Sequence, residues 1–225
     1  MAERIGVYGG TFDPPHLGHL AIAERLVSEF SLDHLLMVPA ATPPHKRRQT
    51  ISSPFHRLAM LALATAESAK IYVSPLELEP AATPYTVDTL RRLQQNHPEA
   101  HLYFVMGADS FRDLSSWHRF EELLIRYSTI VAMRPGFPGK EATNWQELAG
   151  NLPTRFQELV VDLRGGRHLL TEQMERPQIY LTDYVSVDVS ATNIRLAVAE
   201  GGSLHDLVPP SVATYIKKYQ LYSHA

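Results

Sequence analysis

The sequence GGTFDPPHLGHL occupies residues 9–20 and joins a short apolar segment to an amphipathic one. The apolar segment, residues 4–8, predicts a buried strand that Gly9 and Gly10 are expected to end. The proline pair at 14–15 suits a loop and a first helical turn, and one broad apolar face over 17–30 predicts a helix. The stretch therefore indicates one strand–helix unit of an α/β fold.

The alternation of strands and helices continues along the chain. Further strands are expected at 35–38, 71–74, 102–106, 129–133 and 179–182, and further helices at 54–67, 86–95, 120–126, from 190 onward and from 210 to about 219. Strands separated by helices imply a parallel sheet with right-handed crossovers. We therefore expect a single Rossmann-like, doubly wound α/β domain over residues 1–225, with a mainly parallel sheet and helices on both faces. Residues from about 135 to 178 carry only a weak helical pattern at 145–148, and we expect them to be peripheral.

Composition excludes several classes of protein. The 225 residues are 44% hydrophobic and 20% charged, and no apolar run approaches the roughly 18 residues that span a bilayer, so no membrane segment is expected. The first ten residues lack the features of a secretory signal and cysteine is absent, which favours a cytoplasmic protein. A formal net charge of -3 gives no overall basic field, so nucleic acid is not an expected partner. Nothing indicates a homo-oligomer, although none is excluded.

The distinctive residues gather in the loops that follow the expected strands. These loops contain residues 9–19, 43–46, 107–109 and 134–136. In an open parallel sheet such loops share one edge, which is where ligands bind in doubly wound folds. We therefore expect the four loops to meet at one crevice. The run at 45–48 is basic, and a solvated loop is its alternative interpretation.

The first loop has the features of a phosphate site. Gly9 and Gly10 let backbone amides approach a phosphate closely, and the helix that follows directs its positive end to the same point. The stretch lacks the Lys-Ser/Thr ending of a P-loop and the GxGxxG spacing of a dinucleotide fingerprint. Neither of those two common interpretations fits.

His16 and His19 are three residues apart at the expected helix start, so their imidazoles face the same way, and Gly18 between them leaves room for a ligand. Three interpretations remain open: structural histidines, two ligands of a zinc ion, or donors to phosphate oxygens. Zinc is disfavoured because the HExxH spacing and a cysteine ligand are both missing. The adjacent glycine turn favours the phosphate interpretation, in which the donors stabilise charge that builds up during phosphoryl transfer.

The stretch at 9–20 closely resembles the signature of the HxGH nucleotidyltransferase superfamily, and within it that of the bacterial nicotinate mononucleotide adenylyltransferases. The resemblance extends, in the family's order, to PPHK at 43–46, YTVDT at 85–89, GAD at 107–109 followed by Trp117, and SATNIR at 190–195. Family members often carry a second serine where this chain has Ala191. The resemblance implies transfer of the adenylyl group of ATP to nicotinate mononucleotide.

The resemblance also assigns roles to single residues. Gly10 and Thr11 would line the phosphates, His16 and His19 would contact the reacting and leaving phosphates, and Lys46 would reach a phosphate from the basic loop. In the acceptor site, Trp117 would stack on the pyridine ring, while Thr86 and the backbone near His118 would receive its carboxylate. For the tryptophan, the alternative interpretation is ordinary packing.

Two further sets of residues are expected to bind substrate. Asp109 would hold a ribose, with a helix N-cap as the alternative. Ser190, Thr192 and Arg195 suit the terminal phosphates, with a capped helix and a surface arginine as the alternative. Mg²⁺ would arrive on the ATP phosphates, because we find no carboxylate cluster for it.

The expected site is the sum of these motifs. Its expected catalytic residues are His16, His19, Lys46 and Arg195, with no metal ligand. Its expected substrate-binding residues are Gly9, Gly10, Thr11, Phe12, His45, Thr86, Gly107, Asp109, Trp117, His118, Arg134, Ser190, Thr192 and Asn193. The rival functions are a sibling enzyme that uses nicotinamide mononucleotide or phosphopantetheine, and a nucleotide-binding regulator without turnover.

Overall fold

The computed structural model describes residues 2–41, 51–80, 82–133, 149–167, 169, 174, 176–185, 187 and 189–223. These residues form one seven-stranded sheet in the order β3-β2-β1-β4-β5-β7-β6, and each neighbouring pair is parallel. The expected Rossmann-like α/β class is therefore confirmed. The strands are β1 (Arg4–Gly10), β2 (His34–Pro39), β3 (Ile71–Val73), β4 (His101–Gly107), β5 (Ser128–Ala132), β6 (Val160–Asp162) and β7 (Ile179–Thr182).

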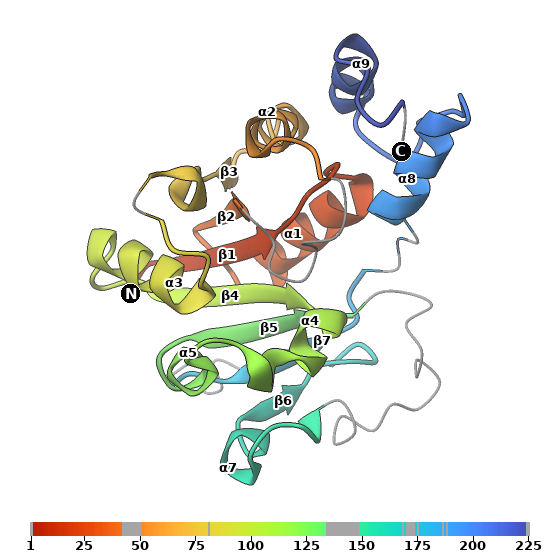
Figure 1. The fold of residues 1–225 in the computed structure, drawn as a ribbon. Helices are drawn as coiled ribbons and strands as arrows, with labels where there is room; N and C mark the ends of the chain where they lie inside the picture. The colour runs from red at the N-terminus through yellow and green to blue at the C-terminus, as the bar shows by residue number, and fades with distance from the viewer. Residues whose placement is uncertain are drawn as a thin grey trace.

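The order of the strands creates a switch point between β1 and β4. The chain winds outward from β1 to β2 and β3, and then returns to the other side of β1 for β4 and β5 (Figure 1). The two central strands run side by side, with Tyr8 opposite Val105. Because the loops after these two strands diverge to opposite faces, a crevice opens at their carboxyl ends.

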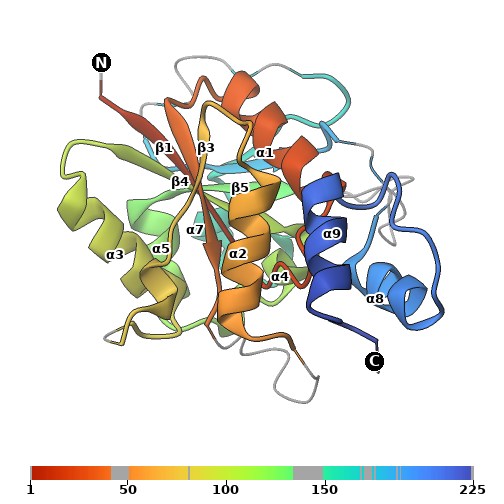
Figure 2. The ribbon, with the colours of Figure 1, turned by 90° about the horizontal axis from the view of Figure 1, so that it is seen from above.

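Helices cover both faces of the sheet (Figures 1 and 2). Along each strand alternate residues enter different cores: Phe104 packs with α3 and α5, whereas Val105 packs with α1. This alternation follows from the period of two residues in a strand. The helices that flank the sheet are α1 (Leu17–Glu29), α2 (Pro54–Ala64), α3 (Thr86–Asn96), α4 (Ala108–Arg112) and α5 (Phe120–Arg126), with short turns η2 (Leu76–Leu78) and η3 (Leu114–Ser116).

The last two helices pack away from the sheet. α8 (Ala191–Ala199) and α9 (Pro210–Lys218) share a small core with α2, built around Met60, Ile194 and Val212. In Figure 2, α9 lies beside α2 and near the beginning of α1. The C-terminal part of the chain is thereby brought back to the loop that follows β1.

The structure corrects several expected boundaries. β1 is two residues longer than the expected 4–8, because Gly9 and Gly10 still belong to the strand and pair with Val38 and Pro39. The edge strand β6 and the short helix α7 (Thr154–Gln157) lie in the segment for which only a weak helical pattern was expected. Both were missed because a run of three or four residues is too short to show a period. The pattern expected at 145–148 lies outside the described residues.

Candidate functional site

A cavity of about 470 Å³ opens at the carboxyl ends of β1 and β4, the position expected for a ligand. Its volume suits a small ligand such as a mononucleotide. Seven of the residues expected from the sequence line it: Gly9, Gly10, Thr11, Thr86, Gly107, Trp117 and His118. The motifs after β1 and β4 and at the start of α3 are therefore brought together.

Aromatic rings form one wall of this cavity. Trp117 is partly buried and packs edge-on against Phe104, with ring centroids 6.2 Å apart. Beside it, His118 lies over Tyr85, with centroids 4.1 Å apart and planes inclined by 31°. Trp117 therefore both packs and lines the cavity, so the two interpretations of this residue are compatible. The ring pair from Tyr85 and His118 joins the start of α3 to the segment before α5.

Backbone amides at this wall differ in their availability. The amide of Trp117 already donates to the carbonyl oxygen of Leu114, at 2.9 Å. The amide of Thr86, which lines the cavity, opens α3, where the first N–H groups have no intrahelical acceptor. An anionic group in the cavity can thus be received at the positive end of α3. At the other side of the wall, the His118 amide is a better candidate donor than that of Trp117.

Glu77 also lines the cavity, and sequence reasoning missed it. The hydroxyl group of Thr89 donates to its Oε1 at 2.9 Å. Burial raises the pKa of the Glu77 carboxyl above its ordinary value of 4.5, more than the Thr89 hydrogen bond and the charge of Arg57 lower it. The folded chain therefore binds this proton more tightly than the unfolded chain does.

This pKa shift predicts a pH dependence of stability. Because the folded state holds more protons on Glu77 than the unfolded state, its contribution to the free energy of unfolding falls as pH rises from 4.5 through the folded-state pKa. Glu77→Gln keeps an acceptor for Thr89 but has no charge to bury. We expect its stability to exceed that of the wild type increasingly as pH rises through this window, measured by urea unfolding at a series of pH values. Glu79→Gln, at a half-exposed neighbour paired with Arg92, is the control and should give no such gain.

The β1–α1 loop, residues 11–16, ends at His16, which is the N-cap of α1, and His19 lies in the first turn of that helix. Their rings stack with centroids 3.6 Å apart and planes inclined by 26°. Both are buried, and the rings of Phe12 and Tyr8 pack edge-on against His19 at 5.0 and 6.1 Å. The two imidazoles are therefore fixed in orientation before any ligand binds, which is what preorganised donors require.

The backbone also fixes the tautomer of His19. The backbone amide of His16 donates to Nδ1 of His19 at 3.2 Å. A ring nitrogen that accepts a hydrogen bond does not carry a proton, so the proton of the neutral ring lies on Nε2. The far nitrogen of His19 is thus set up as a donor.

The glycines on either side of this loop make room for side chains. A Cβ on Gly10 would come within 2.8 Å of the Phe12 ring, and one on Gly18 within 3.1 Å of the His16 ring. We expected Gly18 to leave room for a ligand, but the space is used by His16. Phe12 itself is buried beneath the loop, at a φ of 50°, and does not line the cavity. Its side chain supports His19.

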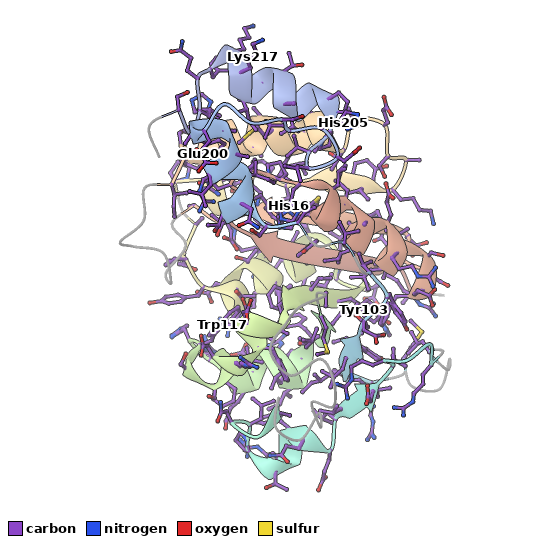
Figure 3. The ribbon with its side chains drawn as sticks, turned by 90° about the vertical axis from the view of Figure 1, so that its right-hand side faces the viewer. His16, Tyr103, Trp117, Glu200, His205 and Lys217 are labelled. Atoms are coloured by element: carbon purple, nitrogen blue, oxygen red, sulfur yellow. The ribbon has the colours of Figure 1, made fainter. Side chains whose placement is uncertain are left out.

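Arg195 joins α8 to the same loop. Its Nη1 donates to the carbonyl oxygen of Asp13 at 2.8 Å and its Nη2 to the Thr192 hydroxyl at 3.3 Å. Ser190 caps the helix by accepting from the amide of Asn193 at 3.1 Å. The capped-helix interpretation is therefore correct for Ser190, but Arg195 is half-buried and is not a surface arginine. Figure 3 shows His16 next to the blue ribbon of α8 and Trp117 on the green segment farther down.

Asp13 links three parts of the chain, and the sequence did not reveal it. Its carboxylate accepts from the Tyr222 hydroxyl at 2.6 Å and from the Ser52 amide at 3.2 Å, while its carbonyl oxygen accepts from Arg195. Burial and the Asp13 charge raise the pKa of Tyr222, so its hydroxyl remains a donor. The C-terminal segment is thereby tied to the β1–α1 loop.

The remaining expected residues are placed differently. Asp109 lies exposed in the first turn of α4, whose N-cap is Gly107, so the N-cap interpretation of Asp109 is wrong. It does not line the cavity, and neither do Ser190, Thr192, Asn193 and Arg195. His45, Lys46 and Arg134 lie outside the described residues. In the part of the chain that is described, no helix is long and apolar enough to cross a membrane.

Residues 7–197 match the profile of a family described as cytidylyltransferase-like. The chain belongs to this cytidylyltransferase-like family. Two relatives carry the name "Probable nicotinate-nucleotide adenylyltransferase". That of Geobacter sp. (strain M21) is 37% identical over 223 residues, covering 99% of both chains. That of Desulfitobacterium hafniense (strain Y51) is 36% identical over 220 residues, covering 98% of this chain and 96% of its own.

Solved structures share the cytidylyltransferase-like fold over nearly the whole chain. Plasmodium falciparum nicotinic acid mononucleotide adenylyltransferase complexed with NaAD superposes with a TM-score of 0.68 at 20% identity, covering 99% of this chain and 98% of that one. The same protein complexed with APC gives a TM-score of 0.66 at 20% identity over the same shares. At this identity the likeness establishes the fold.

The sequence predicted several residues of this cytidylyltransferase-like chain that line the cavity, but not the charged residues that the fold buries beside them. Arg57 is the largest fully buried side chain and reaches the loops after β1 and β2. Glu77 and Asp13 were missed for the same reason. An isolated charged residue in a helix, turn or loop gives no signal of burial, which becomes visible only when its partners are placed around it.

Proposed function

We propose that this chain transfers the adenylyl group of ATP to nicotinate mononucleotide, giving nicotinate adenine dinucleotide and pyrophosphate. The observation that carries the proposal is the course of the β1–α1 loop. Gly9 and Gly10 at the end of β1 and Thr11 at the start of the loop line the cavity, and the loop continues into the His16–His19 pair. One loop thus joins a mononucleotide-sized cavity to a pair of fixed donors. The names of the relatives support the same reaction.

In this reaction, the phosphate of the acceptor attacks the α-phosphorus of ATP in line. A new P–O bond forms as the bond to pyrophosphate breaks, and no covalent enzyme intermediate is needed. Because the attacking phosphate is already ionised at neutral pH, a general base contributes little. The work of the protein is positioning and stabilisation of the developing charge. His19, with its proton on Nε2, and its stacked neighbour His16 are the proposed donors.

We further propose that ATP enters with Mg²⁺ on its phosphates, as part of the substrate. Within the described ranges, no group of three or more His, Cys, Asp or Glu side chains could hold a metal ion. Both carboxylate oxygens of Asp13, next to Arg195, already accept hydrogen bonds from the chain itself. The protein itself would then contact the phosphates near Asp13 with a cation, the guanidinium group of Arg195.

An acceptor panel tests the proposal directly. Pyrophosphate release is measured with ATP and, in turn, nicotinate mononucleotide, nicotinamide mononucleotide, phosphopantetheine or no acceptor. We expect release chiefly with nicotinate mononucleotide, and nicotinate adenine dinucleotide as the product. Release with phosphopantetheine would identify a sibling enzyme, and ATP binding without release under any condition would favour a regulator.

Arg195→Ala should raise the KM for ATP about tenfold, with a smaller change in kcat. We expect this because the guanidinium group would contact phosphates that are present before the reaction starts, and a hydrogen bond to a charged group contributes about 1.5–3 kcal/mol. Steady-state kinetics with ATP as the varied substrate measures the effect. Arg167→Ala, at an exposed arginine in the loop after β6, is the control. An unchanged KM in a folded Arg195 variant would contradict the assignment.

A further inference from the structure

Arg57, in the first turn of α2, is a fully buried cation that bridges separate loops. Its Nη1 donates to the carbonyl oxygen of Thr11 at 2.7 Å. Its Nη2 donates to the carbonyl oxygens of Ala40 at 2.6 Å and Ala41 at 3.3 Å. Its Nε donates to the carbonyl oxygen of Ser52 at 3.1 Å. One side chain therefore holds the loop after β1, the loop after β2 and the residue pair before α2.

The charge of this side chain is balanced by backbone oxygens. Among the described residues, no carboxylate forms an ion pair with Arg57, and the charges of Asp13 and Glu77 act on it from a distance. Burial lowers the pKa of the Arg57 guanidinium, and the charge of Asp13 opposes that shift. A buried charge of this kind is tolerated only where its donors are satisfied. The four carbonyl contacts provide that satisfaction.

The residues that Arg57 holds are those that face the cavity. Thr11, Ala40 and Ala41 all line it, whereas Arg57 does not. The amide of Ala40 also donates to the carbonyl oxygen of Gly10 at 2.9 Å, which joins the two loops directly. Arg57 thus lies behind the cavity wall and is in contact with the wall's backbone.

The direction of these contacts matters for an anionic ligand. In a trans peptide the C=O and N–H groups point in opposite directions. By drawing the carbonyl oxygens of Thr11 and Ala40 toward itself, Arg57 turns the N–H groups of the same two peptides, those of Phe12 and Ala41, away from itself. Of these two residues, Ala41 lines the cavity. Carbonyl oxygens would repel a phosphate, whereas amides attract it. The guanidinium also places a positive charge behind the same backbone.

We propose that Arg57 is a positioning residue for the phosphate groups of both substrates. It acts through the backbone at Thr11, Ala40 and Ala41, whose carbonyl groups it holds turned inward. This inference rests on the proposed function and adds to it a residue that touches neither substrate.

The decisive variant is Arg57→Lys, which keeps the positive charge but loses the planar fork that reaches several carbonyl groups at once. We expect its KM values for ATP and nicotinate mononucleotide each to rise about tenfold, with a smaller fall in kcat. Arg57→Ala should be weaker still, and low millimolar guanidinium chloride, well below the concentration that unfolds proteins, should restore part of its kcat/KM. Arg92→Met is the matched control, because Arg92 also donates to a backbone carbonyl, that of Leu76, away from these loops.

Two results would overturn the proposal. The first is an Arg57→Lys variant with a lower Tm but both KM values within twofold of the wild type, because Arg57 would then be merely structural. The second is equal rescue of the Arg92 variant by guanidinium. Pyrophosphate binding by calorimetry separates this inference from the proposed function. If the wild type shows no turnover with any acceptor, the proposed function is wrong, but the positioning role can still be tested. Unchanged pyrophosphate affinity in Arg57→Lys would refute that role, and a tenfold weaker affinity would support it.

Discussion

Replacing His19 with alanine should lower kcat by about 10²–10³ while changing the KM for ATP much less, and His16→Ala should have an effect of the same order. The reason is that charge on the transferred phosphoryl group grows during the reaction, so a donor aimed at it contributes most in the transition state. Steady-state kinetics with the acceptor saturating measures the split between kcat and KM. Normal turnover in both variants would return the pair to a structural role.

The hydrogen bond inside the pair allows a sharper test. His19→Asn can keep an acceptor near the Nδ1 position for the amide of His16 but has no donor at the Nε2 position. His19→Gln extends a donor farther out. If the Nε2 proton carries the effect, the asparagine variant should be folded but slow, and the glutamine variant should recover part of the rate. His205→Ala, at an exposed histidine paired with Asp206, is the control and should leave kcat unchanged.

The sequence predicted the sheet because its central strands are buried and bounded by glycine, proline or amphipathic helices. Residues 179–182 and 120–126 were located to the residue: the apolar run of the strand stops at polar residues on both sides, and the helix has an amphipathic pattern. β6 was missed because Val160–Asp162 is an edge strand of three residues, too short to show the alternation of a strand. Helix ends differed by a few residues, as at α2, where the last turn beyond Ala64 is not formed.

Gly9, Gly10, Thr11 and Gly107 could be predicted because they lie at or just after strand ends, which topology alone brings to one edge. Thr86, Trp117 and His118 were expected from the family resemblance. The sequence did not predict that the site residues form two groups, one on each side of the β1–α1 loop. Trp117 and Thr86 line the cavity, whereas His16, His19 and Arg195 lie toward α8 and the C-terminal helices. This separation depends on the hydrogen bonds that Tyr222 and Arg195 donate to Asp13, across 209 and 182 residues of the chain. Contacts over such separations leave no local pattern.

The lining of the cavity determines the expected choice of acceptor. We expect the chain to prefer nicotinate over nicotinamide mononucleotide, although Glu77, an acid, lines the same cavity. The raised pKa of Glu77 reduces the negative charge that this carboxyl would otherwise place near the ligand. The opening amide of α3, at Thr86, and the amide of His118, both at residues that line the cavity, are the expected donors to a carboxylate. The neutral amide ligand would lose the charge and present an NH₂ group where an acceptor is needed.

The expected preference in kcat/KM is about a hundredfold or more, because hydrogen bonds to a charged group contribute about 1.5–3 kcal/mol each and two donors are available. Trp117→Ala separates this effect from ring stacking. The indole ring can stack on either pyridine, so its loss should weaken both acceptors while leaving much of the preference intact. The measurement is kcat/KM for both mononucleotides in the wild type and in Trp117→Ala, with the Tm recorded because Trp117 also packs against Phe104. Equal wild-type values would contradict the nicotinate assignment. A preference that vanishes in Trp117→Ala would place the discrimination in the ring stack, because the amides of α3 are untouched by that change.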